Sequence, residues 1–272
     1  MLYFPNAKIN IGLHITSKRE DGFHNLSTLF YPTKLSDGLE IVRSERDESH
    51  LSLSGLKIDG SAKDNLVYKA YEMIHAKYNI PVVDLHLHKK IPFGAGLGGG
   101  SSDASFVLKG LNKMFDLHIS NEMLMDMAAE LGSDCPFFII NEPCFATGRG
   151  DVLTPSLLSL KGYRLVLVHP NIMVSTPDAF RYVVPQVPDI PLEESLSMPI
   201  TRWKDHVVNH FEKSVFCQYP KIKELKDKLY QLGATYASMS GSGSTVFALF
   251  EEYVPWSKEM LSPSYFVWDE VL

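Results

Sequence analysis

A run of glycines between an alternating apolar segment and a helical pattern constrains this chain most. Residues 92–102 read Pro-Phe-Gly-Ala-Gly-Leu-Gly-Gly-Gly-Ser-Ser, and residues 82–88 before them alternate as a strand does. Beyond the run, apolar residues recur at helical spacing: Ala104, Val107, Leu108 and Leu111. We expect Ser101 or Ser102 to cap this helix, with Asp103 in its first turn.

A strand, a glycine-rich loop and a capped helix together form an anion site. Glycines let the backbone approach a ligand closely, and the helix dipole favours phosphate at the N-terminus. A plain flexible loop is the simplest alternative. Gly94, Gly96 and Gly99 also spell G-x-G-x-x-G, but no strand ending in an acid follows roughly 20 residues later, as a dinucleotide fold requires. No G-K-[S/T] follows, which excludes a Walker A loop.

Composition narrows the class of protein and its surroundings. The net charge of -6 over 272 residues speaks against a nucleic-acid partner. Three scattered cysteines predict neither a disulfide framework nor a zinc ribbon. With no signal peptide pattern and no long apolar run, we expect no membrane contact and a cytoplasmic location. We expect a monomer or a weak homodimer, and we interpret His86 and His88 as exposed strand residues, because no third metal ligand lies near them.

The remaining segments predict mixed helices and strands. Residues 7–15 alternate as a half-buried strand whose polar row includes Lys8, Asn10 and His14, and residues 23–31 return as the second strand of a hairpin. Helices are expected over Asn65–Tyr78, from Asn121 to a stop at Gly132, from a cap at Thr176, and over Lys221–Leu232. The pattern restarts after Gly150, so we predict one domain over 1–155 and another over 156–272.

Three polar features can be interpreted at this point, two of them in two ways. Asp134 stands between the helix stop and Pro136, where it could serve as a catalytic base or cap the next helical turn. Lys8 by itself is best read as an ordinary solvent-facing lysine. The loop Gly241–Ser244, within the connection Ser240–Ser244 of two expected strands, either makes a simple hairpin connection or presents N–H groups to the substrate side.

The segment from Pro92 to Ala104 resembles the ATP-phosphate loop of the GHMP kinases, which include galactokinase and the homoserine, mevalonate and phosphomevalonate kinases. Three further segments agree in order and spacing, so that the resemblance covers roughly Asn6 to Phe250. They are Ala7-Lys8-Ile9-Asn10 with Asp21-Gly22-Phe23-His24, Gly132-Ser133-Asp134-Cys135-Pro136-Phe137-Phe138, and Gly241-Ser242-Gly243-Ser244. The triple glycine before Ser-Ser narrows it to the member that acts on a cytidine diphosphate derivative of methylerythritol.

This resemblance implies a two-domain α+β kinase with its active site in the cleft between the domains. The N-terminal domain would bind ATP. The γ-phosphate would pass, with Mg²⁺, to the 2-hydroxyl of that small-molecule substrate in the non-mevalonate route to isoprenoid precursors. Another GHMP kinase is the nearest alternative. A nucleotide-binding regulator without catalysis and a nicotinamide-dependent oxidoreductase are more distant ones.

The resemblance also implies roles for particular residues. Asp134 would be the catalytic base and Lys8 would lie near it and the acceptor hydroxyl. Mg²⁺ would be carried by ATP, with Ser102 as its one candidate contact and no other protein ligand. The implied ATP-binding residues are Asn65, Lys90, Pro92, Gly94, Ala95, Gly96, Leu97, Gly98, Gly99, Gly100, Ser101 and Ser102.

The substrate side follows from the same resemblance. His24 would hydrogen-bond the cytosine and Phe180 would stack on it, although Phe180 could equally pack in the core. Two positions depart from the family pattern: Phe23 replaces a tyrosine and His210 replaces an aspartate. The implied substrate-binding residues are Asn10, Phe23, His24, Thr176, Phe180, Gly241 and Ser242.

Overall fold

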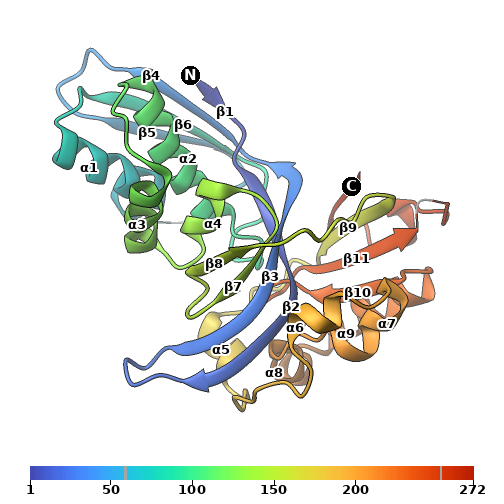
Figure 1. Ribbon diagram of the computed structural model, residues 1–272. Coiled ribbons are helices and arrows are strands. Elements are labelled where there is room, and N and C mark those ends of the chain that lie inside the picture. Colours follow the sequence, from blue (N-terminus) through green and yellow to red (C-terminus); the bar gives the residue numbers. More distant parts are fainter. Residues whose placement is uncertain (58–59, 252) are drawn as a thin grey trace. The chain divides into compact units, whose positions relative to one another are not determined.

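A computed structural model describes residues 1–57, 60–251 and 253–272 and shows an α+β protein (Figure 1). The strands are β1 Leu2–Tyr3, β2 Asn6–Lys18, β3 His24–Ser36, β4 Gly38–Arg43, β5 His50–Gly55, β6 Val83–Lys89, β7 Cys144–Thr147, β8 Val152–Pro155, β9 Tyr163–His169, β10 Tyr236–Met239, β11 Val246–Glu251 and β12 Phe266–Val271. The helices are α1 Leu66–Tyr78, α2 Gly99–Met114, α3 Asn121–Leu131, α4 Cys135–Ile140, α5 Thr176–Phe180, α6 Leu192–Leu196, α7 Ile200–His206, α8 Phe211–Gln218 and α9 Pro220–Gln231, with short 3₁₀ turns at Ala62–Asp64 and Lys258–Met260. Among the described residues, no helix is long and apolar enough to cross a membrane.

The chain forms two compact units that draw on separate stretches of sequence. The first unit contains Met1–Lys8, Pro32–Phe93 and Gly98–Glu142; the second contains Ile9–Tyr31, Gly94–Leu97 and Pro143–Leu272. One cut between residues 155 and 156 would not separate these units, because residues 9–31 group with the C-terminal part. As a division of the sequence, that boundary stays a prediction, and so does the expected cleft.

The first unit is a sheet with helices on one face. Its strand order is β1-β4-β6-β5, with β4 antiparallel and β5 parallel to β6. Helices α1, α2 and α3 pack against it through one apolar core (Figure 1). The inward residues Leu85 and Leu87 of β6 are buried, whereas His86 and His88 are exposed on the opposite face, as predicted. Their rings share the hydroxyl of Ser54.

Strand β2 is buried on both faces, so the prediction of a half-buried strand is wrong. The predicted hairpin is confirmed, since β2 and β3 are neighbours in the sheet order β2-β3-β7-β8. The polar row of β2 points inward because each member meets a polar partner there. Asn10 Nδ2 donates to Thr28 Oγ1 at 3.1 Å, and His14 Nδ1 lies 3.1 Å from His210 Nε2.

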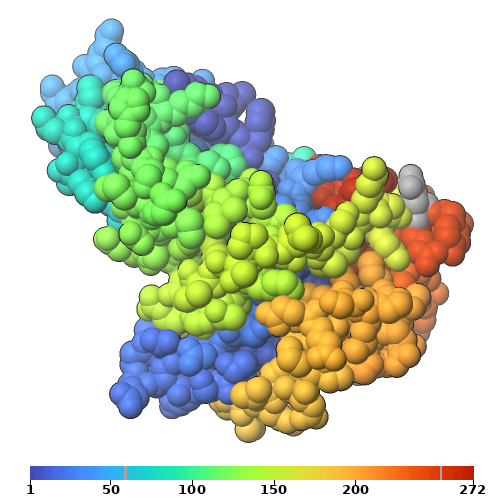
Figure 2. Space-filling model, viewed as in Figure 1, coloured from blue at the N-terminus to red at the C-terminus, as the bar shows by residue number. Residues whose placement is uncertain are grey.

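The second unit contains the sheet β10-β11-β9-β12, covered by α5, α8 and α9 around a second apolar core. The hairpin residues of this unit lie against the segment that follows α5. The N–H of Gln186 donates to the carbonyl of Ile15 at 2.8 Å, and Leu13 bridges to Asn209. In Figure 2 the hairpin (blue) borders the residues near 180 (gold).

The contact between His14 and His210 predicts a loss of stability in acid. Burial, and then the neighbouring His210, lower the pKa of His14 from 6.5 to about 4. A folded pKa below the unfolded value means that stability is fully present above pH 6.5 and is lost as pH falls toward 4. We expect this group to remove about 3 kcal/mol of unfolding free energy over that range.

Urea unfolding of wild type and His14→Asn at pH 7 and pH 4.5 measures this contribution. The variant should lose less stability than wild type between the two pH values. His118→Asn, at an exposed histidine, is the matched control and should follow wild type. Equal losses in wild type and His14→Asn would contradict the prediction.

Candidate active site

Lys8 and Asp134, predicted from distant parts of the sequence, lie together in the first unit. Lys8 Nζ is 3.1 Å from Asp134 Oδ2, and the Lys8 side chain is only 3% exposed whereas that of Asp134 is 35% exposed. Lys8 is therefore not the solvent-facing lysine that its surroundings in sequence favoured. A buried ammonium beside a carboxylate open to solvent can hold that carboxylate while a ligand approaches it.

A helix stop and a proline set the position of Asp134. Helix α3 ends at Leu131 with Gly132 as its C-cap, and Pro136 lies in the first turn of α4. Asp134 occupies the N-cap position of α4, yet its side chain makes no capping hydrogen bond. Its carboxylate pairs with Lys8 instead, so the capping reading does not account for this residue.

The end of the glycine loop lies beside the same lysine. Gly98 adopts a left-handed φ of +69°, and a Cβ there would be 3.1 Å from Lys8 Cε and 3.0 Å from Phe138 Cζ. Helix α2 begins at Gly99 with Gly98 as its N-cap and has no side-chain cap. The first N–H groups of any α-helix lack intrahelical acceptors, and here no side chain accepts from them, so they are open to an anion close to Lys8.

The predicted cap of α2 is wrong, and so is that of α5. Because glycine reaches the left-handed region without a steric cost, α2 starts before the serines, and Ser101 and Ser102 lie in its first turn. Ser102 is buried, and among the described residues its Oγ has no hydrogen-bond partner. In α5 the cap is Ser175, which accepts from the N–H of Asp178, and Thr176 is the first helical residue.

In the second unit, residues 94–97 of the glycine loop lie against the segment Ser240–Ser244. The Ser240 hydroxyl donates to the carbonyl of Gly96 at 2.8 Å and accepts from the N–H of Asn10 at 3.2 Å. The N–H of Thr245 donates to the carbonyl of Ala95 at 3.2 Å. The segment joins β10 to β11 as a hairpin connection, and it also holds this part of the glycine loop.

Asn209 is a residue of this neighbourhood that the sequence did not single out for a role. Its amide Nδ2 donates to the carbonyls of Met239 at 2.7 Å and Gly241 at 2.8 Å. It thereby holds the start of the Ser240–Ser244 segment. The only sequence signal was its place beside His210, where the pattern departs from the family.

His24 and Phe180, also predicted, are stacked in the second unit. Their ring centroids are 4.6 Å apart at an interplanar angle of 23°, and Phe180 also meets Phe211 edge-on at 4.8 Å. Burial, and then Lys18, lower the pKa of His24, which favours a neutral ring. Phe23 is exposed, with the Arg149 guanidinium 5.2 Å from its ring centroid. Phe180 therefore combines a core contact with a stacking surface.

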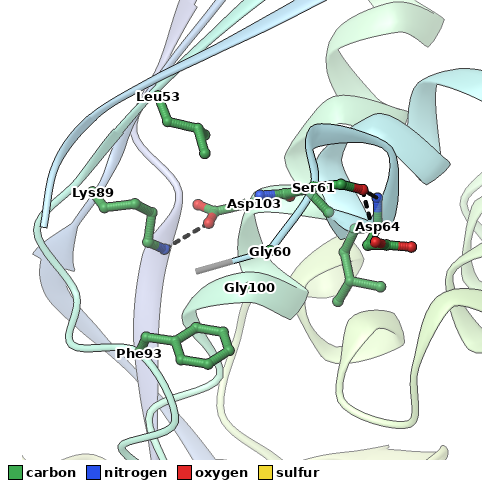
Figure 3. Close-up of a pocket in the computed structure, with 10 residues that line it drawn as sticks. Leu53, Gly60, Ser61, Asp64, Lys89, Phe93, Gly100 and Asp103 are labelled. Atoms are coloured by element: carbon green, nitrogen blue, oxygen red, sulfur yellow. Dashed lines mark hydrogen bonds and ion pairs between the residues drawn. The ribbon is translucent and has the colours of Figure 1, made fainter. Parts of the chain in front are cut away.

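A cavity of about 260 Å³ lies in the first unit beside the start of α1. Asn65 caps α1 by accepting from the N–H of Val67 at 2.9 Å. Lys89, rather than the exposed Lys90, lines the cavity, together with Phe93 (Figure 3). Its other lining residues are Leu53, Gly60, Ser61, Asp64, Asn65, Leu66, Gly100 and Asp103.

The three cysteines are free, as predicted, and differ in accessibility. Cys135 and Cys144 are buried, and burial raises the pKa of their thiols to about 11 and about 12. Cys217 is exposed on α8. The residue next to Asp134 in sequence is thus an inaccessible thiol.

Comparisons with known proteins identify the family of this chain. The family model for the GHMP kinases N terminal domain matches residues 65–142, and the model for the GHMP kinases C terminal matches residues 198–255. The 4-diphosphocytidyl-2-C-methyl-D-erythritol kinase of Bacteroides fragilis is 54% identical over 252 residues, covering 92% of each chain. The chain belongs to the 4-diphosphocytidyl-2-C-methyl-D-erythritol kinases, a family of GHMP kinases.

Other relatives support the same assignment. The enzyme of that name from Parabacteroides distasonis is 48% identical to this kinase, covering 99% of this chain and 98% of the relative. A crystal structure of 4-(cytidine 5'-diphospho)-2C-methyl-D-erythritol kinase is 35% identical with a TM-score of 0.78, covering 92% of this chain and 90% of that chain. The mevalonate kinase of Methanococcus jannaschii, at 13% identity over 99% of this chain and 97% of its own, has a TM-score of 0.72 and shows the fold alone. This GHMP kinase therefore has the predicted α+β fold and is a small-molecule kinase.

Proposed function

We propose that this kinase transfers the γ-phosphate of ATP to the 2-hydroxyl of 4-diphosphocytidyl-2-C-methyl-D-erythritol. The observation that supports it best is the pair of Lys8 and Asp134 at 3.1 Å, beside the uncapped start of α2. A phosphoryl-transfer site needs an acceptor for the hydroxyl proton and positive groups around the phosphates. The identity of the substrate is inferred from the names of the relatives, and the type of reaction is inferred from the residues of the site.

In this mechanism Asp134 accepts the proton of the substrate hydroxyl as its oxygen attacks the γ-phosphorus. The bond between the γ-phosphorus and the bridging oxygen breaks, and ADP leaves with that oxygen. The buried ammonium of Lys8 offsets negative charge in the transition state, and the N–H groups at the start of α2 bind phosphate oxygens. Mg²⁺ carried by ATP would offset charge on the phosphates, and the Oγ of Ser102, which has no hydrogen-bond partner among the described residues, fits a contact to it or to a phosphate.

We place the adenine of ATP in the cavity beside Asn65. At about 260 Å³ the cavity suits one nucleobase rather than a whole nucleotide. Phe93 and Leu53 give it apolar walls, and Asn65, the cap of α1, also lines it. The backbone of residues 94–100 would then carry the phosphates, and a direct contact from Lys90 stays a prediction.

We place the cytosine of the substrate at the rings of Phe23, His24 and Phe180. A neutral histidine can donate from one ring nitrogen and accept at the other, which suits the edge of a base. Contacts from Asn10, Thr176, Gly241 and Ser242 stay predictions. The cytoplasmic location, the monomeric or weakly dimeric state and the absence of a nucleic-acid partner also stay predictions.

The stacking role of Phe180 predicts a selective effect on the acceptor. Phe180→Ala should raise the KM for the cytidylyl substrate about 10-fold to 100-fold, because stacking on a base is worth about 1–3 kcal/mol. The KM for ATP should stay within twofold. Phe180→Tyr keeps the ring and should stay near wild type. A large fall in melting temperature with an unchanged acceptor KM would instead favour the core-packing role.

Steady-state ADP release with ATP and Mg²⁺ tests the proposed function. The acceptors are 4-diphosphocytidyl-2-C-methyl-D-erythritol, homoserine, mevalonate and galactose. Turnover of the cytidylyl compound alone, with the product phosphorylated at the 2-hydroxyl, is the expected result. Turnover of another acceptor would overturn the substrate assignment, and silence from folded, ATP-binding protein would favour the noncatalytic regulator.

A further inference from the structure

Three buried charged side chains of the first unit form a cluster next to the glycine loop. Asp37 lies between β3 and β4, Lys89 ends β6, and Asp103 lies in the second turn of α2. None of the three is more than 3% exposed. Lys89 Nζ donates to Asp37 Oδ2, and also to Asp103 Oδ2 at 2.6 Å; Figure 3 shows the second contact.

The cluster joins the two ends of the glycine loop. Asp37 Oδ1 accepts from the N–H of Lys90 and, at 2.8 Å, from that of Ile91, which immediately precede the loop. Asp103 belongs to the helix that leaves the loop. One carboxylate therefore holds the backbone before the loop, and it is linked through Lys89 to the helix after the loop.

The first residue of α2 packs directly on this cluster. A Cβ at Gly99 would lie 2.9 Å from Ile91 Cγ2 and 3.3 Å from Lys89 Nζ. The N–H of this same Ile91 donates a hydrogen bond to Asp37. A shift of Asp37 or Lys89 would therefore reach the backbone that starts α2, whose N–H groups point toward the phosphates in the proposed function.

A cluster of this kind is a costly way to gain stability alone. Removing two carboxylates and an ammonium from water carries a large desolvation penalty, and a well-packed apolar set of similar volume often stabilises a core as well or better. What the apolar set lacks is directional bonds to the N–H groups of Lys90 and Ile91. The directional bonds fix a backbone position, which apolar contacts do less strictly.

We propose that Asp37, Lys89 and Asp103 form a clamp that positions the glycine loop for ATP, with Asp37 as its key positioning residue. None of the three needs to touch the phosphates. The proposal rests on the assignment of the loop to ATP. In addition, the conformation of the loop is set by residues that lie outside it.

Asp37→Asn tests the clamp with little change in shape. The asparagine side chain has one oxygen where aspartate has two. It therefore cannot accept hydrogen bonds both from the N–H groups of Lys90 and Ile91 and from Lys89 Nζ, and position 37 loses its connection through Lys89 to Asp103. We expect the Kd for ATP, measured by calorimetry, to rise about tenfold, as for other residues that act through neighbours. Amide hydrogen exchange at Lys90 and Ile91 should become faster by a similar factor. The acceptor KM should stay within twofold.

Asp103→Asn and a destabilised control separate positioning from stability. Asp103→Asn leaves the bonds of Asp37 intact and should weaken ATP binding less than Asp37→Asn does. Ile222→Ala removes a buried side chain from the core of the second unit and serves as a control of lowered melting temperature. It should bind ATP within twofold of wild type.

Two results would overturn the clamp. One is an ATP Kd for Asp37→Asn within twofold of wild type. The other is an equal loss of ATP affinity in Ile222→Ala. Neither readout requires the cytidylyl acceptor, so the clamp can fail while the proposed reaction stands. Conversely, an enzyme that phosphorylates another acceptor would still report on the clamp through ATP binding and exchange.

Discussion

Asp134→Asn should lower kcat about a thousand-fold, within the range that a positioned general base contributes. Asparagine keeps the shape of the side chain, and its amide oxygen can still face the ammonium of Lys8, so the fold should survive. What is lost is the group that accepts the proton of the attacking hydroxyl. The KM values for ATP and acceptor should change little, because the loss falls on the transition state.

Single-turnover phosphorylation of the cytidylyl substrate measures this effect. Asp126→Asn, at an exposed carboxylate of α3 in the same unit, is the matched control and should keep wild-type turnover. Lys8→Met should also lower kcat by about a hundred-fold or more, because it removes a buried charge beside the reacting groups. If Asp134→Asn kept more than a tenth of wild-type kcat, another group would have to accept the proton.

Gly96→Ala should remove activity through the backbone rather than through chemistry. Gly96 has a φ of +77°, and a Cβ there would be 2.1 Å from the carbonyl oxygen of Ser240. The left-handed conformation alone costs an alanine about 1–2 kcal/mol. The collision with a backbone atom adds to this and must displace residues 94–97 or the Ser240–Ser244 segment. We expect a loss of about 3 kcal/mol of stability and at least a hundred-fold loss of kcat/KM.

Gly162→Ala isolates the first of these two costs. Gly162 has a similar φ of +90°, but among the described residues, its two neighbours in sequence aside, no atom lies within 4 Å of the position its Cβ would take. This variant should lose about 1 kcal/mol and keep full activity. The comparison uses urea unfolding and steady-state kinetics on both variants. Equal stability losses in the two would mean that the Ser240–Ser244 segment yields freely, and the tight approach would then carry no weight.

The residues near the proposed chemistry were largely predictable from the sequence. Lys8 and Asp134 stand in short segments whose order and spacing resemble a known family, and the structure brings them to 3.1 Å. His24 and Phe180 followed from the same resemblance and are in contact. Without the resemblance, the residue pattern predicted a solvent-exposed Lys8, because lysine side chains are mostly exposed.

The supporting residues were not predictable in the same way. Asp37 and Lys89 are 52 residues apart, and nothing in their local sequence marks either as buried. A buried ion cluster depends on tertiary pairing, which no period of two or 3.6 residues encodes. The cap of α2 was missed for a different reason. Serine is a usual N-cap residue, but here Gly98, in the left-handed conformation, is the N-cap, and the helix begins two residues before Ser101.

The burial of Cys135 has a practical consequence for anyone who screens this enzyme with thiol-reactive compounds. At neutral pH a thiol with a pKa of about 11 is almost wholly protonated, and one that is also fully buried is a poor nucleophile. Rapid modification should therefore occur at Cys217, on α8. A maleimide dye would label that single position and leave the Lys8–Asp134 pair untouched. Slow inactivation by such reagents would require opening of the fold around the buried thiols, so the rate of inactivation would measure the rate of that opening.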